Sequence, residues 1–208
     1  MANNLEILIL AAGKGTRMNS DTPKVLQPLL GIPMIEHVVA KSLSLKPKKI
    51  TMLIHKGLKF LEKKYPKINF IIQEPQLGTG HAVQIFTKKN NNQKNNVLVL
   101  YGDNPLIDEQ DLKKVVLYLK NNHICLLGFE QKNNSSYGVI VKKNNQVETI
   151  VEYKDATEEQ KKIQICNSGI MGLSPKVLSY IFDIKNNNNK KEFYLTDIVK
   201  ISKKYNHL

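Results

Sequence analysis

Short apolar runs that alternate with helix-like segments constrain the fold most. Residues 5–10, 50–54, 68–72 and 97–100 are largely apolar and only four to six residues long. Runs of this length are typical of strands that are buried on both faces of a parallel sheet. Helix-like spacing lies between them, as at Ile35, Val38 and Val39 behind Pro33, at residues 80–89, and after Asp108. The first half of the chain is therefore expected to be doubly wound.

The second half carries more strands and fewer helices. After residue 123 we expect strands at 123–129, 138–141, 147–152 and 164–173. Ser174 and Pro175 are expected to start a short helix, and residues 193–205 to form another. The predicted fold class is α/β, with a Rossmann-like doubly wound, mostly parallel mixed sheet, and residues 1–208 are expected to form one domain.

Composition narrows the class of protein. Hydrophobic residues make up 41% of the 208 residues and charged residues 24%, as in soluble globular proteins. The apolar runs are far below the ~20 residues of a membrane helix, and residues 1–6 do not resemble a signal peptide. Cys125 and Cys166 have no disulfide or metal-ligand spacing. We expect a cytoplasmic protein without a membrane partner.

The net charge of +13 does not by itself indicate a nucleic-acid partner. Lys and Arg number 31 against 18 Asp and Glu, but Arg17 is the single arginine. Base readout and stacking favour arginine and clustered aromatic residues. Many lysines lie in Asn/Lys-rich stretches, expected to be surface loops, at 88–96, 130–136 and 185–191. We expect no nucleic-acid or DNA-type partner, although a polyanion-binding patch remains open, and the field would attract phosphorylated small molecules.

A glycine-containing segment, Leu-Ala-Ala-Gly-Lys-Gly-Thr-Arg-Met at residues 10–18, follows the first strand. Small residues let the backbone approach a ligand, and successive N–H groups can bind oxyanions. The segment is neither a Walker A loop nor a complete dinucleotide motif, because Met18 stands where the third glycine belongs. Arg17 could bind phosphate bidentately, and Lys24, stiffened by Pro23, is a second phosphate-ligand candidate. A structural turn, a chance arginine and a surface lysine are the alternatives.

Asp103 follows the strand at 97–100, at the edge where open α/β sheets place ligands. A carboxylate there is costly unless it is paired or metal-bound, and Mg²⁺ favours one or two carboxylates with phosphates and water. A turn aspartate before Pro105 is the competing interpretation. Equally, Gln73 could belong to a helix cap, Glu152 to an exposed strand and Asn167 to a turn, and His81 is better explained as a packed helix residue than as a catalyst.

Together these segments resemble the sugar-phosphate nucleotidyltransferases, most closely the N-acetylglucosamine-1-phosphate uridylyltransferase domains that are fused to an acetyltransferase. The likeness spans essentially the whole chain. Besides residues 10–18 and Pro-Lys-Val-Leu at 23–26, the matching blocks are residues 73–82, 101–106, 137–138, 150–156, 167–169 and 193–197.

The resemblance implies Mg²⁺-dependent transfer of uridylyl from UTP to N-acetylglucosamine 1-phosphate, with pyrophosphate as the second product. Arg17, Lys24 and Asp103 would be catalytic: Arg17 and Lys24 would hold the phosphates and Asp103 would bind the metal. The uracil and ribose would contact Leu10, Ala11, Ala12 and Gly13, and the uracil edge would contact Gln73, Gly78 and Thr79. The amino sugar and ribose would contact Tyr101, Gly102, Gly138, Glu152 and Asn167.

Three departures from the family pattern matter. The second metal ligand of the family, an asparagine, has no counterpart in a matching block, and Asn206 does not take its role. The β-helix acetyltransferase domain is absent from these residues, so we expect no acetyl transfer. Ser168 replaces the usual threonine beside Asn167. Two alternatives stay open: a relative with another sugar or base, and a non-catalytic domain that only binds nucleotide sugar.

Overall fold

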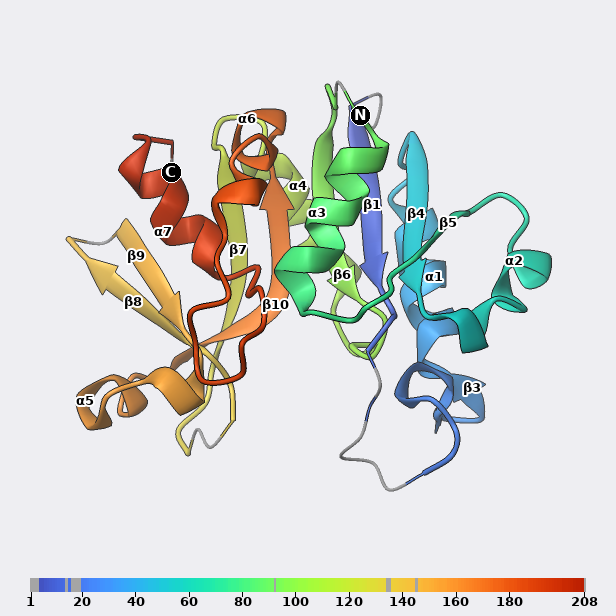
Figure 1. Cartoon of the computed structure of the whole chain (residues 1–208), viewed down its shortest axis with the longest axis horizontal. Coiled ribbons are helices and arrows are strands. Elements are labelled where there is room, and N and C mark those ends of the chain that lie inside the picture. The colour runs from blue at the N-terminus through green and yellow to red at the C-terminus, as the bar shows by residue number, and fades with distance from the viewer. Residues whose placement is uncertain are drawn as a thin grey trace.

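An eight-stranded mixed sheet forms the centre of the chain (Figure 1). The computed structural model describes residues 4–13, 15, 20–91, 93–133, 136–144 and 146–207. The strand order is β5-β4-β1-β6-β10-β8-β9, and β7 also pairs with β10. The strands are β1 (Leu5–Leu10), β4 (Lys49–Ile54), β5 (Asn69–Ile72), β6 (Asn96–Tyr101), β7 (Ile124–Glu130), β8 (Val139–Lys143), β9 (Gln146–Val151) and β10 (Ile165–Leu173), with a separate hairpin of β2 (Pro28–Leu29) and β3 (Ile32–Pro33).

The direction of the strands changes halfway along the sheet. Strands β5, β4, β1 and β6 are parallel, with Ile9 of β1 facing Met52 on one side and Leu100 on the other. Strand β10 runs antiparallel to β6, β7 and β8, and β8 runs antiparallel to β9. This arrangement confirms a doubly wound first half and a mixed extension of the same sheet.

Helices cover both faces of the sheet (Figure 1). Ile7 and Ile9 pack on the face of α1 and α4, whereas Leu8 and Leu10 pack on the face of α3, α6 and α7. Alternate residues of β1 thus enter two cores, because successive side chains of a strand point to opposite faces. The helices are α1 (Met34–Ser44), α2 (Leu61–Lys64), α3 (Thr79–Lys89), α4 (Glu109–Tyr118), α5 (Glu158–Lys161), α6 (Pro175–Leu178) and α7 (Asp197–Lys204), with 3-10 turns η2 (Lys24–Leu26), η3 (Lys56–Leu58), η4 (Tyr153–Asp155) and η5 (Ile181–Asp183).

The expected helix at residues 193–205 begins only at Asp197. The preceding residues are held by a neighbouring loop, because the Phe193 amide donates to Leu77 O at 2.8 Å and the Phe193 carbonyl accepts from Gly80 N at 2.7 Å. Because the N–H and C=O of Phe193 already have partners, this residue does not form helical hydrogen bonds. Two other helix starts agree with expectation: the carboxylate of Asp108 accepts from Gln110 N at 2.6 Å, and the hydroxyl of Ser174 caps α6.

One residue of the Asn/Lys-rich stretch at 88–96 is not on the surface. Asn95 is buried and donates to Glu6 Oε1 at 2.7 Å. Glu6 is itself buried within β1, so this contact supplies a partner for a carboxylate inside the sheet. In the described part of the chain, none of the helices has the length and apolar character needed to cross a bilayer.

A candidate active site at the ends of β1 and β6

The carboxyl ends of β1 and β6 lie side by side at the point where the chain order reverses. From β1 the chain continues to β4 and β5 on one side, whereas β6 pairs with the other side of β1. Leu10 faces Tyr101 across the two strands, and Gly102 N donates to Leu10 O at 2.9 Å. Open α/β sheets bind ligands at such a switch point. The structure therefore brings residues 10–13 and residues 101–103, which sequence analysis assigned to one site, to the same edge.

Lys24 and Asp103 meet at this edge. Lys24 Nζ lies 2.5 Å from Asp103 Oδ2, and both side chains are about a third exposed. A Cβ added to Gly15 would lie 2.8 Å from Lys24 Cβ, so the glycine segment passes directly beside this lysine. Arg17 lies outside the described residues. Two of the three residues expected to be catalytic thus form one cation–carboxylate pair at the switch point.

The loop after Asp103 is held in place by contacts with α1. Lys41 Nζ, from α1, donates to Pro105 O at 2.7 Å and to Ile107 O, and Asp108 then caps α4. These contacts hold the loop between β6 and α4 to two helices on the same face. Sequence analysis did not single out Lys41, because its role depends on packing between helices that are distant in sequence.

Gln73, Gly78 and Thr79 gather at the start of α3, and we call them the α3 side. Gln73 is buried and its Nε2 donates to Gly78 O at 3.0 Å. The hydroxyl of Thr79 accepts from Leu195 N at 3.1 Å. The first residues of α3 lie at the same edge as the end of β1 (Figure 1), so the helix N-terminus places its positive dipole end there.

His81 packs rather than protrudes. Its ring centroid lies 6.1 Å from that of Phe193, and burial lowers its pKa, although a hydrogen bond to the Pro75 backbone acts in the opposite direction. This environment favours a neutral ring and agrees with the interpretation of His81 as a packed helix residue.

Gly138, Glu152 and Asn167 also meet, and we call them the β10 side. Asn167 N donates to Gly138 O at 2.8 Å, and a Cβ added to Gly138 would lie 3.4 Å from Glu152 Oε1. Thr196 Oγ1 donates to Glu152 Oε1 at 3.2 Å. Sequence analysis assigned no role to Thr196, although its block was matched.

Tyr101 connects the two sides. It ends β6, its hydroxyl interacts with Thr79, and the carboxylates of Glu152 and Asp103 are near enough to act on it electrostatically. Burial raises the pKa of Tyr101, and both carboxylates act in the same direction while Thr79 opposes them. The phenol therefore stays protonated and can donate a hydrogen bond at neutral pH.

The donor set fits a single magnesium ion only with help from a ligand. Within the described ranges, no three His, Cys, Asp or Glu side chains lie close enough to form a metal cluster. Asp103 presents a carboxylate oxygen at the switch point, and this carboxylate already accepts a hydrogen bond from the Lys24 ammonium group. Mg²⁺ is commonly held by one or two carboxylates together with phosphates and water. Asp103 fits that chemistry if a triphosphate supplies the remaining oxygens.

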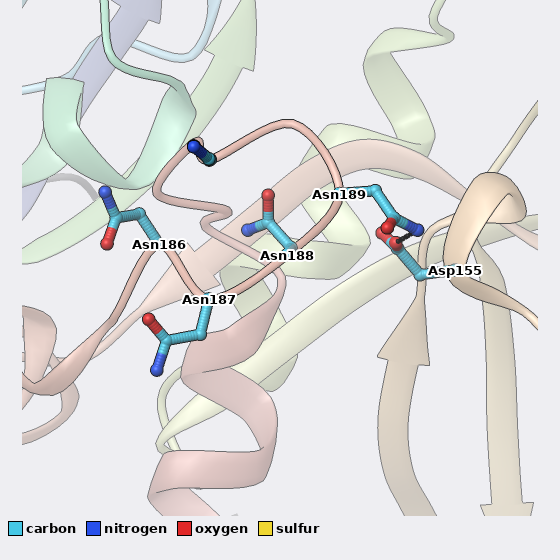
Figure 2. A pocket seen from close by; sticks show the side chains of 6 residues that line it. Asp155, Asn186, Asn187, Asn188 and Asn189 are labelled. Carbon is cyan, nitrogen blue, oxygen red and sulfur yellow. Dashed lines mark hydrogen bonds between the residues drawn. The ribbon is translucent and has the colours of Figure 1, made fainter.

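A separate open cavity of about 530 Å³ lies on the loop before residue 193 (Figure 2). It is lined by Asp155, Asn186, Asn187, Asn188, Asn189 and Lys191. Asn189 Nδ2 donates to Asp155 Oδ1 at 2.6 Å. This hydrogen bond connects the loop to the 3-10 turn η4, which follows Glu152 in the sequence. The lining of the cavity includes Asp155 of this turn but neither Lys24 nor Asp103, so the cavity does not coincide with the Lys24–Asp103 pair.

The half-buried carboxyl of Glu152 predicts a pH effect on the free energy of unfolding. Burial raises its pKa from 4.5, against a weaker opposing effect of the Thr196 hydrogen bond. The folded protein therefore holds this proton more tightly than the unfolded chain, and the free energy of unfolding falls as the pH rises from 4.5 through the raised pKa. Glu152→Gln loses no proton but can still accept from Thr196. We expect the variant to lack this part of the decline in urea unfolding measured from pH 4.5 to about 7.5.

The control for this measurement is Glu159→Gln, which changes an exposed carboxylate on α5. Its pH dependence should follow that of the unmodified protein. Equal slopes for Glu152→Gln and the unmodified protein would contradict the assignment of the effect to Glu152.

Fold and site together define a doubly wound α/β domain with a phosphate-compatible cation–carboxylate pair at its switch point. Residues 7–159 match the model of the MobA-like NTP transferase domain. The chain belongs to this nucleotidyltransferase family.

One similar protein is bifunctional protein GlmU of Buchnera aphidicola subsp. Baizongia pistaciae (strain Bp). It is 44% identical over 209 aligned residues, which cover 99% of this chain and 46% of the relative. The chain thus spans about half the length of that relative.

Two solved structures have the same fold. A UDP-glucose pyrophosphorylase complexed with UDP-glucose gives a TM-score of 0.81 at 19% identity, over 100% of this chain and 89% of that one. A putative glucose-1-phosphate thymidylyltransferase from Bacillus anthracis, in complex with a sucrose, gives 0.78 at 24% identity, over 98% and 85%. At these identities the likeness concerns the fold.

Proposed function

We propose that this domain transfers uridylyl from UTP to N-acetylglucosamine 1-phosphate and releases pyrophosphate. The observation that carries the proposal is the meeting of Lys24 and Asp103 at the β1/β6 switch point, with the α3 side and the β10 side flanking it. The likeness to bifunctional protein GlmU, which extends over nearly the whole chain, supports the choice of substrates. The proposal is confined to nucleotidyl transfer.

In the proposed reaction, a phosphate oxygen of the sugar phosphate attacks the α-phosphorus of UTP. The bond from the α-phosphorus to the bridging oxygen breaks, and pyrophosphate leaves with that electron pair. The attacking phosphate is already ionised, so no general base is required. Such chemistry depends mainly on positioning and charge neutralisation, and it needs no covalent nucleophile from the protein.

The residues divide this work between them. Backbone groups of Leu10, Ala11, Ala12 and Gly13 and the α3 side, Gln73, Gly78 and Thr79, would hold the nucleotide. Tyr101, Gly102 and the β10 side, Gly138, Glu152 and Asn167, would hold the amino sugar and ribose. Lys24 and Arg17 would bind phosphate oxygens. Asp103 would hold Mg²⁺, which supplies charge neutralisation on the phosphates when bound.

The deciding experiment measures pyrophosphate release with a panel of substrates. The purified chain is mixed with Mg²⁺, UTP and either N-acetylglucosamine 1-phosphate or glucose 1-phosphate, and other nucleoside triphosphates replace UTP in parallel. Turnover restricted to UTP and N-acetylglucosamine 1-phosphate is expected. Turnover with another pair would assign a different specificity. Binding of UDP-N-acetylglucosamine by calorimetry without any turnover would indicate a non-catalytic binding domain.

Arg17→Lys tests the proposed phosphate contact. Lysine keeps the charge but loses the planar fork, so turnover is expected to fall by at least about 10-fold. The measurement is the initial rate of pyrophosphate release at saturating substrates. Equal rates in the two proteins would refute the role of Arg17.

A further inference from the structure

The backbone pairing between β6 and β10 ends before it reaches the edge of the sheet that carries the candidate site. The two strands pair at Leu173 with Val97, at Gly172 with Leu98 and at Met171 with Val99. Further toward the site, the pairing of β10 with β7 also shifts register between Asn167 and Met171. The segment of β10 that carries Asn167 is therefore not fixed to β6 by the regular ladder.

The ring of Tyr101 lies in this opening. A Cβ added to Gly169 would lie 2.3 Å from Tyr101 Cε2, and Gly169 has a φ of +88°. Glycine is the residue that permits both this conformation and this close approach. The aromatic ring consequently separates the end of β6 from β10.

Asn104 spans the separation. Its Nδ2 donates to Ser168 O at 3.1 Å. The amide must be the donor here, because a backbone carbonyl can only accept. The acceptor end is itself fixed, since Ser168 Oγ donates to Leu127 O at 2.7 Å and accepts from Ile170 N at 3.2 Å.

The donor end is equally restricted. Pro105 follows Asn104 and limits its backbone to extended conformations. The carbonyl of Pro105 accepts from Lys41 Nζ at 2.7 Å. A short side chain on a restricted backbone thus reaches a restrained carbonyl, which makes a stiff link between β6 and β10.

We propose that Asn104 is a positioning residue that holds the carboxylate of Asp103 in a fixed position relative to Asn167. The proposal rests on the proposed function, in which Asp103 serves the phosphates and Asn167 the acceptor sugar. Each of these residues is the immediate neighbour of one end of the link. Each substrate can bind to its own side without the link, but attack on the α-phosphorus requires both sides to be aligned.

The test compares Asn104→Asp and Asn104→Ser with the unmodified protein. Aspartate keeps the shape but turns an acceptor toward Ser168 O, and serine is too short to reach it. We expect kcat for pyrophosphate release to fall by about 10- to 100-fold, while both KM values stay within about threefold, because two separate substrates require aligned sides only when they react. Calorimetry without metal should show weaker binding of UDP-N-acetylglucosamine, which spans both sides, and a smaller change in the binding of UTP, which lacks the amino sugar.

A matched control is Asn122→Asp. Asn122 Nδ2 also donates to a backbone carbonyl, Tyr118 O at 2.8 Å, but Asn122 is exposed and follows the end of α4. This control is expected to lower thermal stability slightly and to keep kcat. A purely structural role for Asn104 would give the same pattern, a lower Tm with unchanged kcat and unchanged product binding, and would overturn the proposal. Raised KM values with normal kcat would overturn it too.

The outcome separates this proposal from the proposed function. If the unmodified protein releases no pyrophosphate with any substrate pair, the proposed function fails. If the unmodified protein is active and both Asn104 variants match it, only the role of Asn104 fails.

Discussion

Asp103→Asn is expected to lower kcat by at least about 100-fold, because it removes the negative charge that the proposed metal site requires. The side chain keeps its shape, so the loop after β6 should remain in place. The Lys24 ion pair is also lost, but both side chains are partly exposed and the effect on stability should be small. The measurement is pyrophosphate release at saturating Mg²⁺ and substrates, with Tm recorded for the same samples.

Asp111→Asn is the control for this substitution. Asp111 pairs with Lys114 at 3.1 Å on the exposed face of α4, and its loss should leave kcat unchanged. If Asp103→Asn retained a kcat within about twofold of the unmodified protein, a charge worth several kcal/mol to the transition state could not reside there.

Gly78→Ala is expected to destabilise the protein by about 2–4 kcal/mol, through backbone strain and overpacking. Gly78 has a φ of 109° and a ψ of 176°, a region that is almost restricted to glycine. A Cβ would also lie 2.6 Å from Phe193 O, so the segment that contacts the α3 side would have to move. Urea unfolding measures the change, and the KM for UTP should rise in the same variant.

Gly31→Ala separates the two causes. Gly31 also has a positive φ, 79°, but a Cβ there would meet no atom within 4 Å. This control should therefore show only the backbone strain, about 1–2 kcal/mol. Equal destabilisation by the two substitutions would show that the contact with Phe193 contributes nothing.

Local sequence patterns were sufficient to predict most strands of the sheet. The apolar runs at 5–10 and 97–100 became β1 and β6, because strands buried on both faces are largely apolar. Asp108 was recognised as a cap because a helix N-terminus needs an acceptor for its free N–H groups. The short hairpin β2–β3 and the helices α2 and α5 were missed, since two- to four-residue elements carry no periodicity to detect.

The candidate site was predictable where it rested on position relative to a strand end. Asp103 and residues 10–13 were placed correctly at one edge because the carboxyl ends of parallel strands meet there. Asn104, Thr196 and Lys41 act through contacts across the fold, to Ser168, Glu152 and Pro105. Residue type and local spacing contain no signal for such partners. The role of Arg17 stays a prediction.

Strand β10 has a consequence for how the chain is made. It pairs with β6, β7 and β8 and so joins the two halves of the sheet, yet it lies beyond residues 7–159, the part that the family model covers. During synthesis from the N-terminus, β6 is completed long before β10 leaves the ribosome, and its apolar edge at residues 97–100 has no neighbour on that side. An unpaired apolar edge is a template for aggregation, so the nascent chain is most vulnerable in the interval before residue 165 emerges.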